Sequence, residues 1–172
     1  FAALVDPDPW VRYFAAGSLG QRRDADAASV LTGVAVTDAA AHVRIAAFHA
    51  LGALDPDRAV PLAERALGDS AVDSDEDMVG AALAAIAGAR TTRADELLDR
   101  AVRSASVTRR GFAIDALASR PTPATVDALA WAARIPDPHH VAAAAVSALS
   151  TVASAVGGDA CRKAVGAVID VG

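Results

Sequence analysis

The chain has 172 residues, of which 53% are hydrophobic and only 4% aromatic, and alanine supplies much of the hydrophobic share. Its formal net charge of −5 argues against the dominant positive surface on which nucleic-acid binding depends. Cys161 is the only cysteine, so an intrachain disulfide and a thiolate metal cluster are excluded, which fits a reducing compartment such as the cytoplasm.

Two segments near the N-terminus carry the same phrase. In residues 6–20, Asp6 precedes Arg12 by six residues, and in residues 38–52 Asp38 precedes Arg44 by the same interval. In both segments a valine stands before the arginine, alanines follow, and a Leu-Gly pair ends the apolar pattern. Two copies of one amphipathic phrase predict an internal repeat.

The phrase continues along the chain in a weaker form. Its reference positions recur at intervals of 31 to 35 residues, and each is followed by alanine four residues later and by an aliphatic residue eight residues later. This spacing places the apolar residues on one helical stripe. The reference positions are Val11, Val43, Met78, Arg109 and Val141.

A second helix fits between successive copies, at residues 25–35, 58–67, 93–102, 123–134 and 159–169. Because no stretch alternates with period two, we expect an all-α array of about ten helices of roughly 9 to 16 residues, with no sheet. The apolar run 141–156 is too polar to predict a membrane span.

The ends and the buried faces of these helices can also be predicted. We expect N-caps at Asp24, Asp57 and Thr122. Glycines are expected to end helices at Gly20, Gly52, Gly68 and Gly88. The residues expected in the core are Ala47, Leu51, Leu83, Ile86, Ile114, Leu117, Ala145 and Leu149.

The segments 6–20 and 38–52 resemble the HEAT repeat family, in particular the short bacterial form called the phycobilisome-lyase HEAT-like repeat. The resemblance covers essentially the whole chain and implies an α-solenoid of about five helical hairpins in a right-handed superhelix. The Val-Arg helix is then the second helix of each hairpin, and the chain begins inside a unit, as a fragment of a longer chain. The implied units are approximately 1–21, 22–54, 55–89, 90–120 and 121–155, plus a terminal helix at 158–170.

The resemblance also implies a structural ladder, in which an aspartate in each turn pairs with the arginine of the Val-Arg helix. The third unit has the aspartate without the arginine, and the fourth unit has the arginine without the aspartate. We therefore expect a continuous ladder only near the N-terminus, unless the arginine of unit four reaches the aspartate of unit three. Its expected members are Asp6, Arg12, Asp38, Arg44, Asp73 and Arg110.

The second helices of HEAT units usually line the concave face, which makes their non-core side the candidate binding surface. On this side the first two repeats present Trp10, Tyr13, His42, Ile45 and His49. Solvent-facing tryptophan and tyrosine are typical interface anchors, so we expect these residues to bind a partner. The alternative is that Trp10 and Tyr13 pack beneath a preceding repeat.

Metal and catalytic sites are not expected. His42 and His49 are seven residues apart, about 10 Å along a helix axis, which is too far for one ion. The paired His-Glu motifs of HEAT-like deoxyhypusine hydroxylases do not occur here. The acidic run Asp69, Asp73, Asp75, Glu76 and Asp77 lacks the central glycine and distal glutamate of a calcium loop, and fits carboxylates at a helix N-terminus.

The resulting prediction is a non-enzymatic scaffold, without cofactor or small-molecule substrate, that binds a protein or peptide along its concave face. One alternative is a nucleic-acid-binding module that resembles the HEAT-like alkylpurine glycosylases. The arginines that favour it are Arg90, Arg93, Arg100, Arg103, Arg109, Arg110 and Arg120. A second alternative is a lyase or accessory subunit that resembles the bilin lyases.

Overall fold

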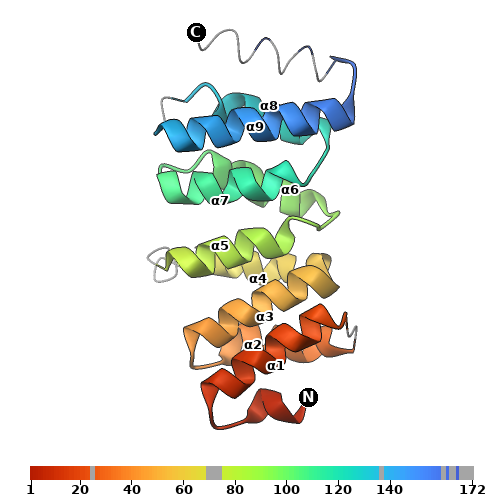
Figure 1. The fold of residues 1–172 in the computed structure, drawn as a ribbon, viewed down its shortest axis with the longest axis vertical. Coiled ribbons are helices and arrows are strands. Elements are labelled where there is room, and N and C mark those ends of the chain that lie inside the picture. The colour runs from red at the N-terminus through yellow and green to blue at the C-terminus, as the bar shows by residue number, and fades with distance from the viewer. Residues whose placement is uncertain (24–25, 69–74, 136–137, 160–161, 163–165, 167–172) are drawn as a thin grey trace. The chain divides into compact units, whose positions relative to one another are not determined.

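A computed structural model of residues 1–172 describes the whole chain except 24–25, 69–74, 136–137, 160–161, 163–165 and 167–172. The described part contains a short 3-10 helix, η1 (Ala2–Val5), and nine α-helices, and no strand occurs in it (Figure 1). The predicted all-α helical repeat fold is therefore confirmed. The chain divides into two compact units, residues 1–94 and 95–172, which are described in turn.

Unit 1 is built in two layers. Its α-helices are α1 (Pro9–Gln21), α2 (Ala27–Thr37), α3 (Ala41–Leu54), α4 (Pro56–Gly68) and α5 (Glu76–Ile86). One layer holds the helices that contain the reference positions, with α1 packed on α3 and α3 packed on α5, while α2 and α4 pack behind them (Figure 1). The segments α2–α3 and α4–α5 thus form two successive helical hairpins.

Unit 2 takes up most of α6 (Thr92–Val102) and then α7 (Val107–Ala118), α8 (Pro123–Ala132) and α9 (His139–Val156). The long helix α9 packs on both α7 and α8. The predicted helix at 159–169, and most of the predicted unit 158–170, lies outside the described residues.

The predicted core is confirmed at all eight positions. Leu51, Leu83 and Leu149 have no exposed surface, and Ile114 and Leu117 are almost as deeply buried. Alanines occupy most of the remaining buried positions, so neighbouring helices approach closely without large side chains between them.

Two of the predicted N-caps can be compared with the structure. Thr122 caps α8, because its hydroxyl accepts a hydrogen bond from the backbone N–H of Thr125. Asp57 is not a cap, since it lies in the first turn of α4, where its carboxylate accepts from the backbone N–H of Arg90. Asp24 lies outside the described residues.

The glycine prediction is correct for two positions and wrong for two. Gly68 is the last residue of α4 and Gly88 follows the end of α5, but Gly20 and Gly52 lie inside α1 and α3. A Cβ atom on Gly20 would lie 2.8 Å from the Cα atom of Ala50. A Cβ atom on Gly52 would likewise lie 2.6 Å from the Cα atom of Ala85. Both glycines allow two helix backbones to touch.

Candidate partner-binding surface on α1 and α3

The start of α1 positions the aromatic residues of the first repeat. The Asp8 carboxylate accepts a hydrogen bond of 2.8 Å from the backbone N–H of Trp10, and Pro9 occupies the first helical position, where its missing N–H is not needed. The helix therefore begins immediately before Trp10, and Tyr13 follows one turn later.

Four rings from two repeats form one cluster. Trp10 stacks on His42, with ring centroids 4.6 Å apart and planes inclined by 25°. Tyr13 meets Trp10 edge to face at 5.7 Å and Phe14 edge to face at 5.2 Å. These geometries are the preferred ones for aromatic pairs. The cluster nevertheless remains open to solvent, because Trp10 is 56% exposed and Phe14 is 65% exposed.

An open groove of about 590 Å³ runs beside this cluster, between α1 and α3. Tyr13 and Phe14 line it from α1, and Ile45 and His49 line it from α3. Small residues form much of the remaining lining, which leaves the groove open between the larger side chains. The other lining residues are Gly17, Ser18, Gly20, Gln21, Ala46, Ala50 and Ala53.

The structure thus places all five candidate binding residues on one surface. Tyr13, Ile45 and His49 line the groove, and the Trp10–His42 stack lies against Tyr13. Sequence reasoning did not single out Phe14. The available signal was an aromatic residue at a position where the next two repeats carry alanine.

His42 has an unusual environment within this cluster. Its Nε2 atom is shielded from solvent and has no hydrogen-bond partner among the described residues. The ring lies between the face of Trp10 and the side of Tyr13, whose centroid is 5.9 Å away. Van der Waals contact with the aromatic rings, and not a polar contact of Nε2, therefore holds this histidine.

Beside the cluster, an ion pair joins the first repeat to the second. Arg12 donates from Nε to Oδ2 of Asp38 at 2.7 Å and from Nη2 to Oδ1 at 2.9 Å. Both side chains are largely buried, at 16% and 8% exposed. The hydrogen bonds from Arg12 lower the pKa of the Asp38 carboxyl below its ordinary value, and they outweigh the opposing effect of burial.

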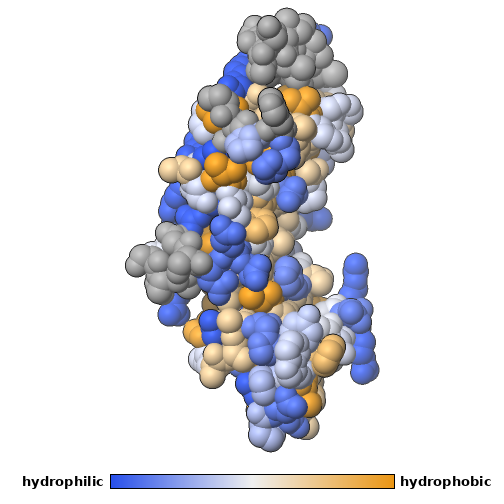
Figure 2. All heavy atoms as spheres, turned by 60° about the vertical axis from the view of Figure 1, so that its left-hand side comes forward, coloured by the Kyte–Doolittle hydropathy of each residue, from blue (hydrophilic) through white to orange (hydrophobic). Residues whose placement is uncertain are grey.

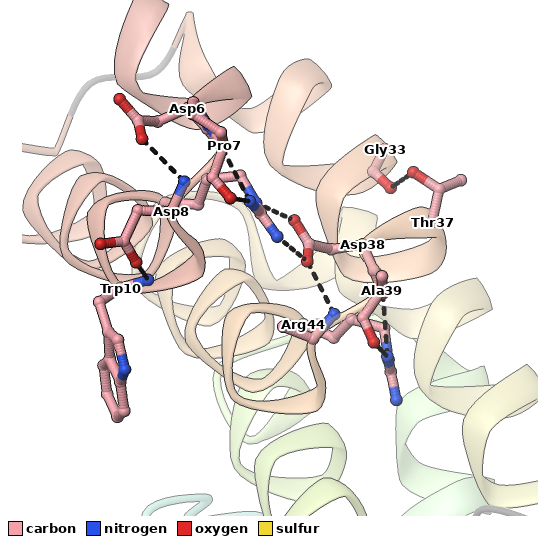
Figure 3. A network of polar contacts seen from close by, with 11 residues as sticks. Asp6, Pro7, Asp8, Trp10, Gly33, Thr37, Asp38, Ala39 and Arg44 are labelled. Carbon is pink, nitrogen blue, oxygen red and sulfur yellow. Dashed lines mark hydrogen bonds and ion pairs between the residues drawn. The ribbon is translucent and has the colours of Figure 1, made fainter.

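The contacts of Arg44 correct one detail of the predicted ladder. Arg44 donates to the backbone carbonyl oxygens of Asp38 at 2.9 Å and Ala39 at 3.3 Å, and not to the carboxylate of Asp38 (Figure 3). That carboxylate accepts from the backbone N–H of Ala40 and turns to the arginine of the preceding repeat, Arg12. Charge pairing therefore runs between repeats, while the contact within a turn is made to a carbonyl.

The same contact within the turn recurs in the other repeats that keep the arginine. Arg12 donates to the carbonyl oxygen of Asp6 at 2.7 Å, and Arg110 donates to the carbonyl oxygen of Ser104. Each carbonyl lies six residues before its arginine, so the contact needs the arginine but no aspartate. Asp73 lies outside the described residues, and its pairing with Arg44 or Arg110 stays a prediction.

The described residues contain neither a metal-binding cluster nor a membrane-spanning helix. No group of three or more histidine, cysteine, aspartate or glutamate side chains there is arranged to hold a metal ion. Within the same residues, no helix combines the length and apolar character that crossing a bilayer requires.

Comparison with known proteins identifies the repeat. No curated protein matches the sequence significantly. A family model described as HEAT repeats matches residues 1–91, more than half of the chain and nearly all of unit 1. The matched region contains both copies of the Asp/Val-Arg phrase, the Arg12–Asp38 pair and the groove between α1 and α3. The chain therefore belongs to the HEAT repeat family.

Proposed function

We propose that this protein is a non-enzymatic HEAT-repeat scaffold that binds a protein or peptide partner through the groove between α1 and α3. The observation that carries the proposal is the convergence of exposed aromatic side chains and an open groove on one surface of two adjacent repeats. In the solenoid implied by the family resemblance, this surface belongs to the concave face. The single cysteine favours a cytoplasmic setting for this role.

The chemistry of the groove suits an apolar segment of a partner. Trp10 and Phe14 expose more than half of their surface, and burying a large apolar side chain contributes about 1.5–3 kcal/mol. Ile45 adds an aliphatic contact, and His49 adds a polar group that orients a bound chain. Tryptophan and tyrosine are also enriched among the residues that carry most binding energy.

The arginines of the chain support a protein partner over a nucleic acid. Arg93 pairs with Glu64, and Arg103 donates to Asp99. Arg120, which is buried, pairs with Asp95. Carboxylates thus neutralise three of the seven arginines that favoured nucleic-acid binding, which reduces the charge available to phosphates.

A selection of displayed peptides tests the proposal. Peptides would be selected on the immobilised full chain, and their affinity would be measured by titration against the chain and its variants. His49→Glu places a charge at the groove, and we expect it to weaken the selected peptides at least tenfold. The matched control is Ser147→Glu, at the same repeat position in α9 and also exposed, which should leave the affinity unchanged.

A second variant separates loss of the surface from loss of folding. Trp10→Ala removes the exposed ring that stacks on His42 while leaving the helix cap at Asp8 in place. We expect weaker peptide binding with an unchanged helical circular dichroism spectrum. The proposal is wrong if the selected peptides bind the His49→Glu and Trp10→Ala variants as tightly as they bind the unaltered chain. It is also wrong if Ser147→Glu weakens their binding.

A further inference from the structure

Among the described residues, one face of α1 has no α-helix packed against it, and only the short 3-10 helix η1 contacts α1 on the side away from α3. Val11, Phe14 and Ser18 follow each other at the spacing of a single helical stripe. Val11 is 39% exposed, Phe14 is 65% exposed, and Ser18 is also exposed. Val11 and Phe14 therefore present apolar surface that gains nothing from burial in this structure.

The equivalent face is buried in the next two repeats. On α3 it consists of Val43, Ala46 and Ala50, and α1 packs on this helix with Gly20 against Ala50. On α5 it consists of Met78, Ala81 and Ala85, which are also buried, and α3 packs there with Gly52 against Ala85. The repeat itself thus indicates what covers this face: the second helix of the preceding hairpin.

The covering helix contributes two particular residues to each of these contacts. In α1 they are Arg12 and, eight residues later, Gly20, and in α3 they are Arg44 and Gly52 at the same interval. The glycine permits backbone contact, and the arginine of α1 binds the turn aspartate of the repeat that it covers, Asp38. A helix that covers α1 in the same way needs the same pair.

The carboxylate of Asp6, in the turn before α1, is held in the same way as that of Asp38. Its Oδ1 accepts 2.9 Å from the backbone N–H of Asp8, as Oδ1 of Asp38 accepts 2.9 Å from the N–H of Ala40 (Figure 3). The two turns therefore hold their carboxylates alike. Asp38 also accepts two hydrogen bonds from Arg12, whereas among the described residues no arginine donates to the carboxylate of Asp6.

We infer that the uncovered face of α1 is a stacking site for one further HEAT-type hairpin, joined to the chain ahead of Phe1. The second helix of this hairpin carries an arginine that binds Asp6 and, eight residues later, a glycine that lies on Ser18. Its apolar residues cover Val11 and Phe14. The path of the chain agrees with a covalent connection, because η1 packs on α1 on the side away from α3 (Figure 1).

A second copy of this chain does not offer the required pair. The positions of arginine and glycine are held by Val79 and Ala87 around α5, by Arg110 and Ala118 in α7, and by Ala142 and Ser150 in α9. The glycines of α1 and α3 already contact Ala50 and Ala85. A helix with both the arginine and the glycine must therefore come from another hairpin. Phe14 belongs both to this face and to the lining of the groove, so the two proposals share that side chain, but the test of the stacking site does not depend on peptide binding.

The chain supplies the probe for a direct test. A copy of residues 22–53 followed by a copy of residues 22–32 is placed ahead of Phe1, which extends the array by one hairpin in register and keeps residues 1–172 intact. The copied second helix brings Arg44 and Gly52 to the positions required at Asp6 and Ser18. Stability is measured by urea unfolding of the natural and extended chains, each with and without Asp6→Asn, which preserves an acceptor for the N–H of Asp8.

We expect Asp6→Asn to shift the urea midpoint of the extended chain and to leave that of the natural chain nearly unchanged. Arg44→Gln in the copied segment should give the same shift, and the two changes together should be no worse than either alone. Gly52→Ala in the copy should also lower the midpoint.

Three results would overturn the inference. Additive shifts from Asp6→Asn and the copied Arg44→Gln would show that these residues do not meet. Separate unfolding of the added hairpin would show that it does not stack on α1. Concentration-dependent dimerisation of the natural chain that Asp6→Asn abolishes would assign the face to a second copy. Sedimentation velocity at several concentrations distinguishes this last result.

Discussion

The two units of the chain use charge differently. In unit 1 the Arg12–Asp38 pair joins one hairpin to the next, and a glycine allows the helices beside it to touch. In unit 2, Arg120 binds Asp95 and Arg103 binds Asp99, so these pairs connect residues of one hairpin or of one helix. The Arg12–Asp38 pair therefore spans two repeats of unit 1, whereas these two pairs of unit 2 lie within one hairpin or one helix.

Apolar packing joins successive helices in unit 2. The long helix α9 packs on both α7 and α8, and buries Leu149 and Val152 almost completely. The guanidinium of Arg103 lies 4.9 Å from the ring centroid of Trp131, where its charge meets an aromatic face. A repeat can thus lose the turn aspartate and still be held in place, provided that its helices bury enough apolar surface.

The two units also differ in the large hydrophobic side chains that they expose. Within the part of the chain that the structure describes, the large hydrophobic side chains that are clearly exposed all belong to the first 36 residues, and they include Phe1, Val5, Trp10 and Phe14. On the side of the molecule seen in Figure 2, hydrophobic atoms appear only as small patches between hydrophilic ones. The apolar surface offered for binding is therefore concentrated at α1 and its neighbours.

The largest expected effects come from truncating one core leucine in each unit, which tests whether the two cores contribute equally to stability. Leu51 and Leu117 occupy the same repeat position, in α3 and α7, and both are buried. We expect Leu51→Ala and Leu117→Ala each to lower the free energy of unfolding by about 2–5 kcal/mol, because each leaves a cavity in a packed site. Chemical denaturation measures both, and a loss below about 0.5 kcal/mol at either position would contradict the assignment of that residue to the core.

A smaller effect tests the glycine contact that is found in unit 1. Gly52→Ala drives a Cβ atom into the backbone of Ala85, and we expect a loss of about 1–3 kcal/mol from overpacking. The control is Gly33→Ala in α2, where a Cβ meets no atom within 4 Å. This control should gain up to about 1 kcal/mol, since alanine is the better helix former. Equal effects at the two positions would show that the helices separate without cost.

A third effect depends on pH. Because Arg12 lowers the pKa of Asp38 in the folded state, the unfolded chain takes up a proton at higher pH than the folded chain. The stability from this pair is therefore present above the unfolded pKa of about 3.9 and is lost as pH falls through the folded pKa. We expect the stability difference between the natural chain and Asp38→Asn to shrink over that range. A difference that is constant with pH would contradict the role of the carboxylate.

The sequence predicted the helices and the core well, because hydrophobic spacing alone determines which face of a helix is buried. Repeat position specifies the side of a helix, so the five candidate residues could be assigned to one side of α1 and α3, but that they bind a partner stays a prediction. The sequence did not predict the acceptor of Arg44. A carbonyl and a carboxylate both belong to Asp38, and only the distance between successive helices decides which arginine reaches each. The purpose of Gly20 and Gly52 escaped prediction for the same reason, because close contact between backbones leaves no trace in periodicity.

The central claim is that the carboxylate of Asp38 pairs with the arginine of the preceding repeat, and a double-mutant cycle on Arg12 and Asp38 tests it most directly. Arg12→Ala, Asp38→Asn and the double variant would be compared by urea unfolding at neutral pH, with Asp38→Asn keeping the acceptor for Ala40. We predict a coupling energy above about 1 kcal/mol, because the two hydrogen bonds are charge-assisted and largely buried. The exposed pair Arg103–Asp99 should give at most about 0.5 kcal/mol, and Arg44 with Asp38 should couple less than Arg12 does. Additive losses at Arg12 and Asp38, or a larger coupling between Asp38 and Arg44, would contradict the account.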